Sequence, residues 1–517
     1  MGVYLCAEQQ RGNRSRRLKE CGVTNHKSAA SILLVVVTLL ACTLSSAPTA
    51  VPTATNAPPP ASASPTSVPP VASPTAITPT ATPPLHASPT GAPAGASPAA
   101  SATAAPGTGA SLVTGVFGAP VTFATHAELS GFGFLWGPSD GQFGAIPAGG
   151  DNYTFYGVAA AASTCAGSPN AKGEFSFTGT LDHVTGSNGC RQLFGPGDGP
   201  TGWTFDRDYA GGGEVVRFAS GGHSGLFVAF HAEYHWKNKA NPPSDWCKIG
   251  TTGSQVPCFY SSIGLAVSTD NGKTFHVVGQ IAQPSQPLST FDGGGNNMEV
   301  GYGSLLVADA NGQHLDNPPA DPSRAYYYLF YSNALPSLPG ACAHANCLAV
   351  ARAPYTAVVA AAFSGDPHQV AALFHNYDGA SPDAWTQLAT AWDSGSQTPD
   401  LAGTAGKFAP LWSDGAAYEP SVIYDGSFNV YLAVYAYKGG FQVRTSSDLL
   451  HWSKPVNAGY FEAGRALVYQ TLMGETGDPT IGGPAPRVYF SSFPTGAFPD
   501  YKTQIFESVT LTVSRSQ

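Results

Sequence analysis

The chain has 517 residues, enough for two or three domains, and a formal net charge of −9 at pH 7. Only 11% of its residues are charged, and many of the basic ones lie near the N-terminus, so the remainder is clearly acidic. This balance argues against a nucleic-acid partner, because such a partner needs a basic surface stripe. The abundance of Gly and aromatic residues and the scarcity of Met are typical of an exported all-β protein.

Residues 1–46 are predicted to be a signal peptide. A basic flank precedes the apolar run 29-AASILLVVVTLLACTLSSA-47, which is too short for a membrane span and ends in small residues. The stretch 39-LLAC-42 resembles the lipobox of exported bacterial lipoproteins. That resemblance implies that Cys42 is lipidated and anchors the protein to the membrane at the cell surface. The alternative is an ordinary signal peptide, an incidental Cys42 and a secreted protein.

Residues 47–110 consist almost entirely of Pro, Ala, Ser and Thr, with almost no charge and no apolar periodicity. Such a segment cannot bury enough surface to offset the entropy of ordering it. We therefore expect a disordered linker that holds the following domain away from a surface. A glycosylated stalk is compatible with the same composition.

The cysteines after the linker fall into neighbouring pairs. We expect sequential disulfides that each staple one loop, as suits an oxidising compartment: Cys165–Cys190, Cys247–Cys258 and Cys342–Cys347. A metal–thiolate site is the alternative, but no C-x₂-C spacing is present.

Strand-like runs of β-branched and aromatic residues recur through residues 111–517 in groups of about four, which start near residues 132, 214, 304, 421 and 466. Repeated four-stranded groups predict a single β-propeller domain, with five blades. Six blades and a pair of β-sandwiches are the alternatives. Within one group, 268-STDNGKTF-275 separates the third and fourth strands. It resembles the Asp-box of sialidase-like propellers, which implies a turn on the outer rim rather than a catalytic element.

Two further segments carry a second resemblance. The stretches 418-YEPSVIYDGSFNVYLAVY-435 and 446-SSDLLHWSKP-455 resemble five-bladed glycoside hydrolases of the arabinanase, xylosidase and invertase kind. In those enzymes carboxylates from different blades meet where the innermost strands begin. Carried over by position, the resemblance implies Asp140 as base, Asp208 as pKa modulator and Glu299 as acid. The first-blade signature W-x-N-D-P-N-G is absent, and turn capping or surface charge is the alternative role for each carboxylate.

Further substrate-binding residues are expected at the same end of the propeller, where the innermost strands begin. In 231-HAEYH-235, alternate strand residues share a face, so His231, Glu233 and His235 are predicted to point together. We favour substrate contact there over a metal site, because the helical H-E-x-x-H spacing is absent. The other candidates lie near the starts of innermost strands or beside them: Tyr302, Glu419 and Asp478.

These features predict a cell-surface glycoside hydrolase-like protein that acts on poly- or oligosaccharide as a monomer. The alternatives are a sialidase-like enzyme and a non-catalytic propeller that binds glycan or protein. The sialidase alternative needs three converging arginines, from among Arg217, Arg324, Arg352, Arg444 and Arg465. No resident metal or nucleotide cofactor is expected, although the sequence leaves open a central calcium ion.

Overall fold

The computed structural model describes most of the predicted propeller domain. The described residues are 112–133, 141–163, 171–203, 205–235, 259–283, 299–334, 346–381, 383–387, 408–412, 417–476, 478–495 and 502–516. The predicted signal peptide, Cys42 and the linker lie outside them. In the described residues, no helix is both long and apolar enough to cross a membrane.

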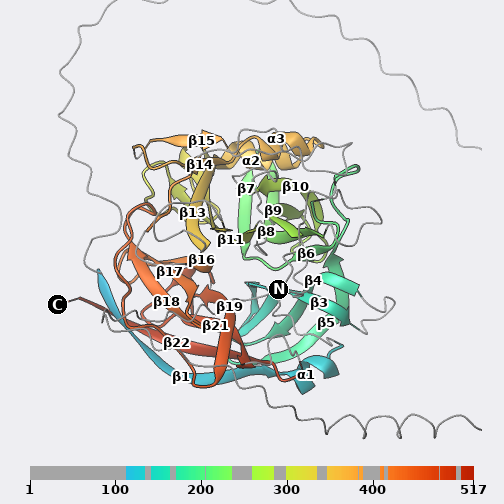
Figure 1. Ribbon diagram of the computed structural model, residues 1–517. Coiled ribbons are helices and arrows are strands. Elements are labelled where there is room, and N and C mark those ends of the chain that lie inside the picture. Colours follow the sequence, from blue (N-terminus) through green and yellow to red (C-terminus); the bar gives the residue numbers. More distant parts are fainter. Residues whose placement is uncertain are drawn as a thin grey trace, which may run out of the picture. The chain divides into compact units, whose positions relative to one another are not determined.

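The domain is a five-bladed β-propeller, with one mainly antiparallel sheet per blade around a central axis (Figure 1). Blade one contains β2 (Gly144–Gly149), β3 (Asn152–Ser163), β4 (Ala171–Gly179) and β5 (Val184–Phe194). Blade two contains β6 (Tyr209–Gly211), β7 (Val215–Ser220), β8 (His223–His235), β9 (Phe259–Ser268) and β10 (His276–Ala282). Blade three contains β11 (Glu299–Asp309), β12 (Ala325–Ala334), β13 (Asn346–Pro354), β14 (His375–Tyr377) and β15 (Trp385–Gln387).

The strands of blades four and five alternate in part along the chain, because β20 of blade four lies between β19 and β21 of blade five. Blade four contains β16 (Tyr418–Asp425), β17 (Val430–Tyr437), β18 (Gly440–Ser446) and the short β20 (Ile481–Gly482), which pairs in parallel with β16. Blade five contains β19 (Arg465–Met473), β21 (Arg487–Pro494), β22 (Ile505–Arg515) and, outermost, β1 (Val113–Thr125). The first strand of the domain therefore completes the last blade and closes the ring.

Apolar side chains fill the interfaces between neighbouring blades. Between blades one and five, Phe123, Phe143, Phe155 and Phe506 form a buried aromatic cluster, with the Phe123 and Phe506 rings 5.1 Å apart. Between blades three and four, the Trp452 and Phe330 rings lie edge to face at 5.9 Å. Alternate residues of each strand thus pack against the adjacent sheet, as the aromatic and β-branched composition requires.

The predicted blade count is confirmed, but the strand composition of two blades differs from the prediction. In blade one, Phe132 follows the helix α1 (His126–Gly131) as its C-cap, and residues 134–136 of the predicted first strand lie outside the described residues; Val184–Phe194 supplies a fourth strand of the described sheet. In blade five the missing strand is β1. Short helices also follow β13 in blade three, namely α2 (Tyr355–Ala362) and α3 (Pro367–Ala371), and η3 (Pro322–Arg324) precedes β12.

Candidate functional site at the mouth of the propeller

Buried polar side chains link the innermost strands around the axis. The backbone N–H of Leu472 donates to Ser421 Oγ at 2.8 Å, and that of Val422 donates to Ser304 Oγ at 2.9 Å. The N–H of Phe143 donates to Thr471 Oγ1 at 3.2 Å in the same manner. Each bond joins one blade to the next. We call the five side chains at this level the axial ring: Gln142, Glu214, Ser304, Ser421 and Thr471.

Glu214 is the ionisable member of the axial ring. Its carboxyl accepts hydrogen bonds from the hydroxyls of Ser304, at 2.6 Å, and of Ser421. Burial raises the pKa of Glu214 to about 8, although both hydroxyl bonds act in the opposite direction. Glu214 therefore holds a proton over much of the neutral range and belongs to the interior of the fold.

Three innermost strands carry a residue in the left-handed region just before the axial ring. The φ angles are 57° at Tyr302, 52° at Glu419 and 62° at Tyr469. At each point the pairing register shifts, between Gly301 and Ser304, Tyr418 and Ser421, and Val468 and Thr471. Such bulges redirect side chains, and non-glycine residues in this conformation concentrate at functional sites. The repeated bulge marks the N-terminal ends of the innermost strands, which we call the mouth.

At the mouth a histidine–glutamate pair packs against tyrosines. Nε2 of His231 lies 3.0 Å from Oε1 of Glu233, and both side chains are buried on β8. The His231 ring stacks on Tyr302 with 4.6 Å between centroids and 4° between planes. The centroid of the Tyr302 ring lies 5.4 Å from that of Tyr418 and 5.7 Å from that of Tyr469. The prediction that His231 and Glu233 point together is thus confirmed.

The predicted carboxylates reach this mouth to different extents. Asp208 is half-buried just before β6, and its backbone N–H donates to the carbonyl of Glu233 at 3.0 Å. Glu299 is the first residue of β11, the innermost strand of blade three. The side chain of Glu419 accepts a hydrogen bond from the backbone N–H of Tyr469. Asp140 and the side chains of Glu299 and His235 lie outside the described residues.

Asp478 lies at the opposite end of the channel. It follows β19 rather than preceding it, and its Oδ1 accepts hydrogen bonds from the N–H and hydroxyl of Thr480 at 2.9 Å and 2.7 Å. Neighbouring β20 pairs with the last residues of β16, whereas Glu419 is near the first. Six residues of strand separate the two levels by about 20 Å. The structure therefore places Asp478 away from the mouth, because 474-GETGDPTIGG-483 follows the innermost strand of blade five instead of leading into it.

The sequence did not predict a role for the buried carboxyl groups of Glu214 and Glu174. Besides Glu214, Glu174 on β4 accepts the N–H of Gly212 at 2.7 Å, and burial raises its pKa to about 8. Gly212 has a φ of 74°, which brings this backbone close to blade one. The run 211-GGGE-214, a flexible segment that ends in an acid before a strand, was the available signal for Glu214.

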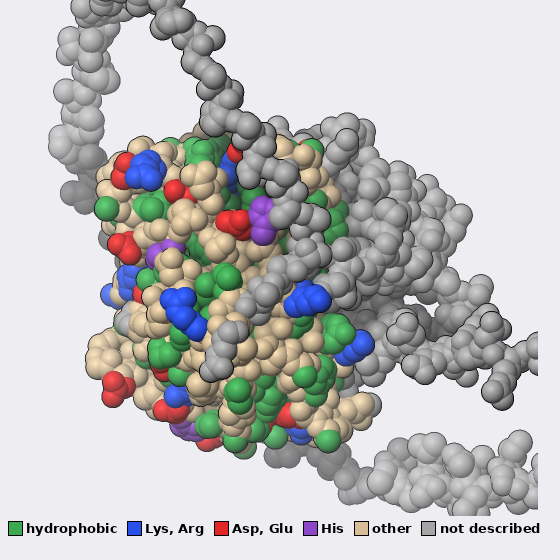
Figure 2. All heavy atoms as spheres, turned by 90° about the vertical axis from the view of Figure 1, so that its left-hand side faces the viewer, with side chains coloured by type: hydrophobic (Ala, Val, Ile, Leu, Met, Phe, Trp, Pro, Cys, Tyr) green, Lys and Arg blue, Asp and Glu red, His purple; other side chains and the backbone are tan. Residues whose placement is uncertain are grey.

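The five arginines considered for a sialidase-like site do not converge. Arg444 packs on Trp412 at 4.8 Å, Arg352 on Trp385 at 4.1 Å, and Arg465 contacts Glu462 at 3.6 Å. Arg324 is exposed beside Asp309, and Arg217 lines a cavity far from the mouth. In Figure 2, the basic and acidic side chains of the face shown are interspersed rather than gathered. The geometry weighs against the sialidase-like alternative.

The stretch 268–275 forms a turn between β9 and β10. The N–H of Gly272 donates to Ser268 Oγ at 2.9 Å, and the N–H and hydroxyl of Thr274 donate to Asp270 at 2.9 Å and 2.6 Å. Burial alone would raise the pKa of Asp270, but the bonds from Thr274 and Ser268 hold it at about 2. A Cβ on Gly272 would lie 1.9 Å from the Tyr156 hydroxyl. These residues therefore build structure, away from the mouth.

The predicted disulfides fall mainly outside the described residues. Cys347 is buried at the start of β13 and is disulfide-bonded. Its predicted partner Cys342 is not among the described residues, and neither are Cys165, Cys247, Cys258 and the side chain of Cys190. All three pairings stay predictions.

Comparisons with known proteins give fold-level likenesses. No protein-family model and no curated protein matches the sequence. An α-L-arabinofuranosidase from Podospora anserina aligns over 78% of this chain and 98% of its own, with 10% identity and a TM-score of 0.38. A family 117 glycoside hydrolase from Zobellia galactanivorans aligns over 78% and 91%, with 10% identity and a TM-score of 0.40. An endo-1,5-α-L-arabinanase from Thermotoga petrophila aligns over 74% and 72%, with 12% identity and a TM-score of 0.33. Similarity this distant assigns no residue role.

Proposed function

We propose that the protein is a glycan-acting hydrolase whose site is the mouth of the propeller. The observation that carries the proposal is the buried His231–Glu233 pair, which stacks on Tyr302 where three innermost strands bulge. Tyrosine faces suit the C–H edges of sugar rings, and carboxylates from several blades suit acid–base chemistry. Asp208, Glu299 and Glu419 belong to the same end of their blades.

The roles follow the two-carboxylate chemistry of glycoside hydrolysis. Glu299 acts as the acid that protonates the leaving oxygen, and Asp140 acts as the base that activates water or attacks the sugar. Asp208, beside Glu233, modulates the pKa of the acid and orients the sugar. His231 holds Glu233 in place for contact with substrate hydroxyls.

The cellular setting extends the proposal. The signal peptide exports the protein, and Cys42 anchors it by a lipid at the cell surface, with the linker as spacer. The domain acts there as a monomer on a carbohydrate partner, without nucleic acid. Disulfides in its long loops suit that compartment.

One observation favours binding without catalysis as the second candidate. The carboxyls of Glu233 and Glu419 both have partners within the protein, the first in His231 and the second in the Tyr469 backbone. Carboxylates held in this way can orient sugar hydroxyls without transferring protons. A non-catalytic glycan-binding propeller would need only this arrangement.

A hydrolysis screen separates the two candidates. The purified protein is incubated with a panel of aryl glycosides and plant and microbial polysaccharides, beside Glu299→Gln and the exposed control Glu475→Gln. Loss of a general acid lowers kcat by about 100-fold or more. Activity that falls so far in Glu299→Gln alone supports the hydrolase. Absence of activity on every substrate, together with retention on a polysaccharide column, favours the binding protein.

A further inference from the structure

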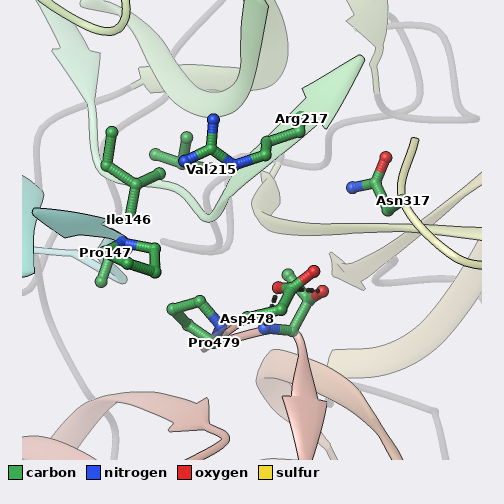
Figure 3. A pocket seen from close by; sticks show the side chains of 9 residues that line it. Ile146, Pro147, Val215, Arg217, Asn317, Asp478 and Pro479 are labelled. Carbon is green, nitrogen blue, oxygen red and sulfur yellow. Dashed lines mark hydrogen bonds between the residues drawn. The ribbon is translucent and has the colours of Figure 1, made fainter. Parts of the chain in front are cut away.

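A polar cavity lies on the side of the axial ring away from the mouth, and Figure 3 shows the side chains that line it. It has a volume of about 40 Å³. Its polar lining comes from Arg217 on β7, Asn317 in the segment between β11 and β12, and Asp478 and Thr480 between β19 and β20. Side chains from blades one, two and five thus meet there with a loop of blade three.

The polar groups of this cavity leave part of their hydrogen-bonding capacity unfilled, although Asp478 accepts two bonds from Thr480. Arg217 and Asp478 face the same space but form no ion pair with each other or with another described residue. Oδ1 of Asn317 is buried and has no hydrogen-bond partner among the residues that the structure describes. Buried polar atoms without partners cost free energy, so such groups are normally bridged by water or by a ligand.

The charges select the kind of ligand. One guanidinium and one carboxylate offset each other, so neither an anion nor a cation gains a net attraction there. Arg217 offers donors only, Asp478 acceptors only, and the Asn317 amide one of each kind. A pair of hydroxyl groups matches this set, because each hydroxyl both donates and accepts.

The size and apolar lining narrow the ligand further. A water needs roughly 10–15 Å³ of such a cavity, so the space admits a few waters or the hydroxyl edge of a ring, but not a buried sugar residue. Ile146, Pro147 and Pro479 complete the wall and can contact the C–H groups between hydroxyls.

We propose that this cavity is a second carbohydrate-binding site, which takes the vicinal hydroxyls of a neutral sugar or polyol. It is separate from the mouth and does not depend on hydrolysis there. Its function would be to hold a glycan on the face opposite the proposed reaction site.

Ligand-observed NMR on the full-length protein tests the site. The probes are neutral monosaccharides and xylitol, with glucuronate and phosphate as charged comparisons. Arg217→Met keeps the aliphatic stem but removes the donors, and Asp478→Asn keeps an acceptor for Thr480 but removes the charge. We expect each variant to bind the neutral probes at least tenfold more weakly. The control Arg207→Met, at an exposed arginine, should bind them as the unmodified protein does, and Glu233→Gln reports any binding of the same probes at the mouth.

Several outcomes would overturn the proposal. Binding that is lost in Glu233→Gln but kept in Arg217→Met would place the sugar at the mouth. Binding of glucuronate or phosphate without the neutral probes would indicate an anion site. No saturation transfer to any probe at tens of millimolar, from a folded protein, would mean that the cavity holds water only. Each result is independent of whether the hydrolysis screen detects activity.

Discussion

The buried acid Glu214, in the axial ring, makes the stability of the folded propeller depend on pH. Its pKa lies near 8 in the folded protein against an ordinary value of 4.5. The folded state therefore retains a proton that the unfolded chain releases between those two pH values. Its contribution to stability is fully present below pH 4.5 and is lost as the pH rises through 8.

Replacing this acid with its amide tests the linkage. In Glu214→Gln the free energy of unfolding should fall less steeply between pH 5 and pH 8 than in the unmodified protein. Proton linkage contributes about 1.4 kcal/mol for each unit by which the folded and unfolded pKa values differ. Urea unfolding at several pH values measures the slopes. Glu475→Gln, at an exposed position, should keep the original slope; equal slopes in both variants would contradict the assignment.

The mouth depends on backbone conformation as much as on side chains. Tyr302, Glu419 and Tyr469 each adopt a left-handed φ, two residues before a hydroxyl side chain of the axial ring. Because the conformation costs about 1–3 kcal/mol per residue, the surrounding sheet has to impose it. The hydroxyl-to-amide bonds between neighbouring blades supply that constraint. Hydrogen bonds of this kind beneath the mouth would fix its geometry before any ligand binds.

The turn between β9 and β10 is expected to affect the stability of the fold and not the mouth. Asp270→Ala removes the acceptor for Thr274 and Ser268, and should lower the free energy of unfolding by about 1–2 kcal/mol. The exposed neighbour Lys273→Ala should change it by less than about 0.5 kcal/mol. Chemical denaturation provides the comparison. A loss of glycan hydrolysis in folded Asp270→Ala would show that the turn does more than build structure.

At the scale of the whole domain, pairing between its first strand, β1, and its last strand, β22, closes the ring of blades. Val113 pairs with Arg515 and Thr125 pairs with Ile505, so the far ends of the domain sequence share one sheet. The same register places Val113 level with the end of β19 and Thr125 level with its start. Leu112 therefore lies on the side of the propeller opposite the mouth.

A disulfide across this closure should stabilise the domain. The Thr114 and Ser514 side-chain oxygens lie 2.9 Å apart, in directly paired residues. In Thr114→Cys/Ser514→Cys the oxidised form should gain about 2–4 kcal/mol and melt at a higher temperature than its reduced form. Thermal unfolding with and without reductant measures the gain, and Thr114→Cys alone is the control. Failure of the cross-link to form in the folded protein would contradict the pairing.

The propeller and part of its mouth could be predicted from the sequence, because alternation, turns and strand repeats are local patterns. The pairing of His231 with Glu233 followed from period-two geometry within one strand. Asp478 lies away from the mouth because the segment that contains it follows the innermost strand of blade five, and the sequence alone does not show which end of that strand faces the mouth. Glu174 was missed because its partner, Gly212, comes from another blade.

Local order along the chain was thus enough to determine an all-β protein with five repeated sheets. Three features depended on how distant segments pack: the closure by β1, the burial of Glu214 between two serines, and the separation of two polar sites at opposite ends of one channel. The physical reason is the same for all three. A strand pattern records which face is apolar, but burial, pKa and the direction of a strand along the axis arise only when five blades enclose a common centre.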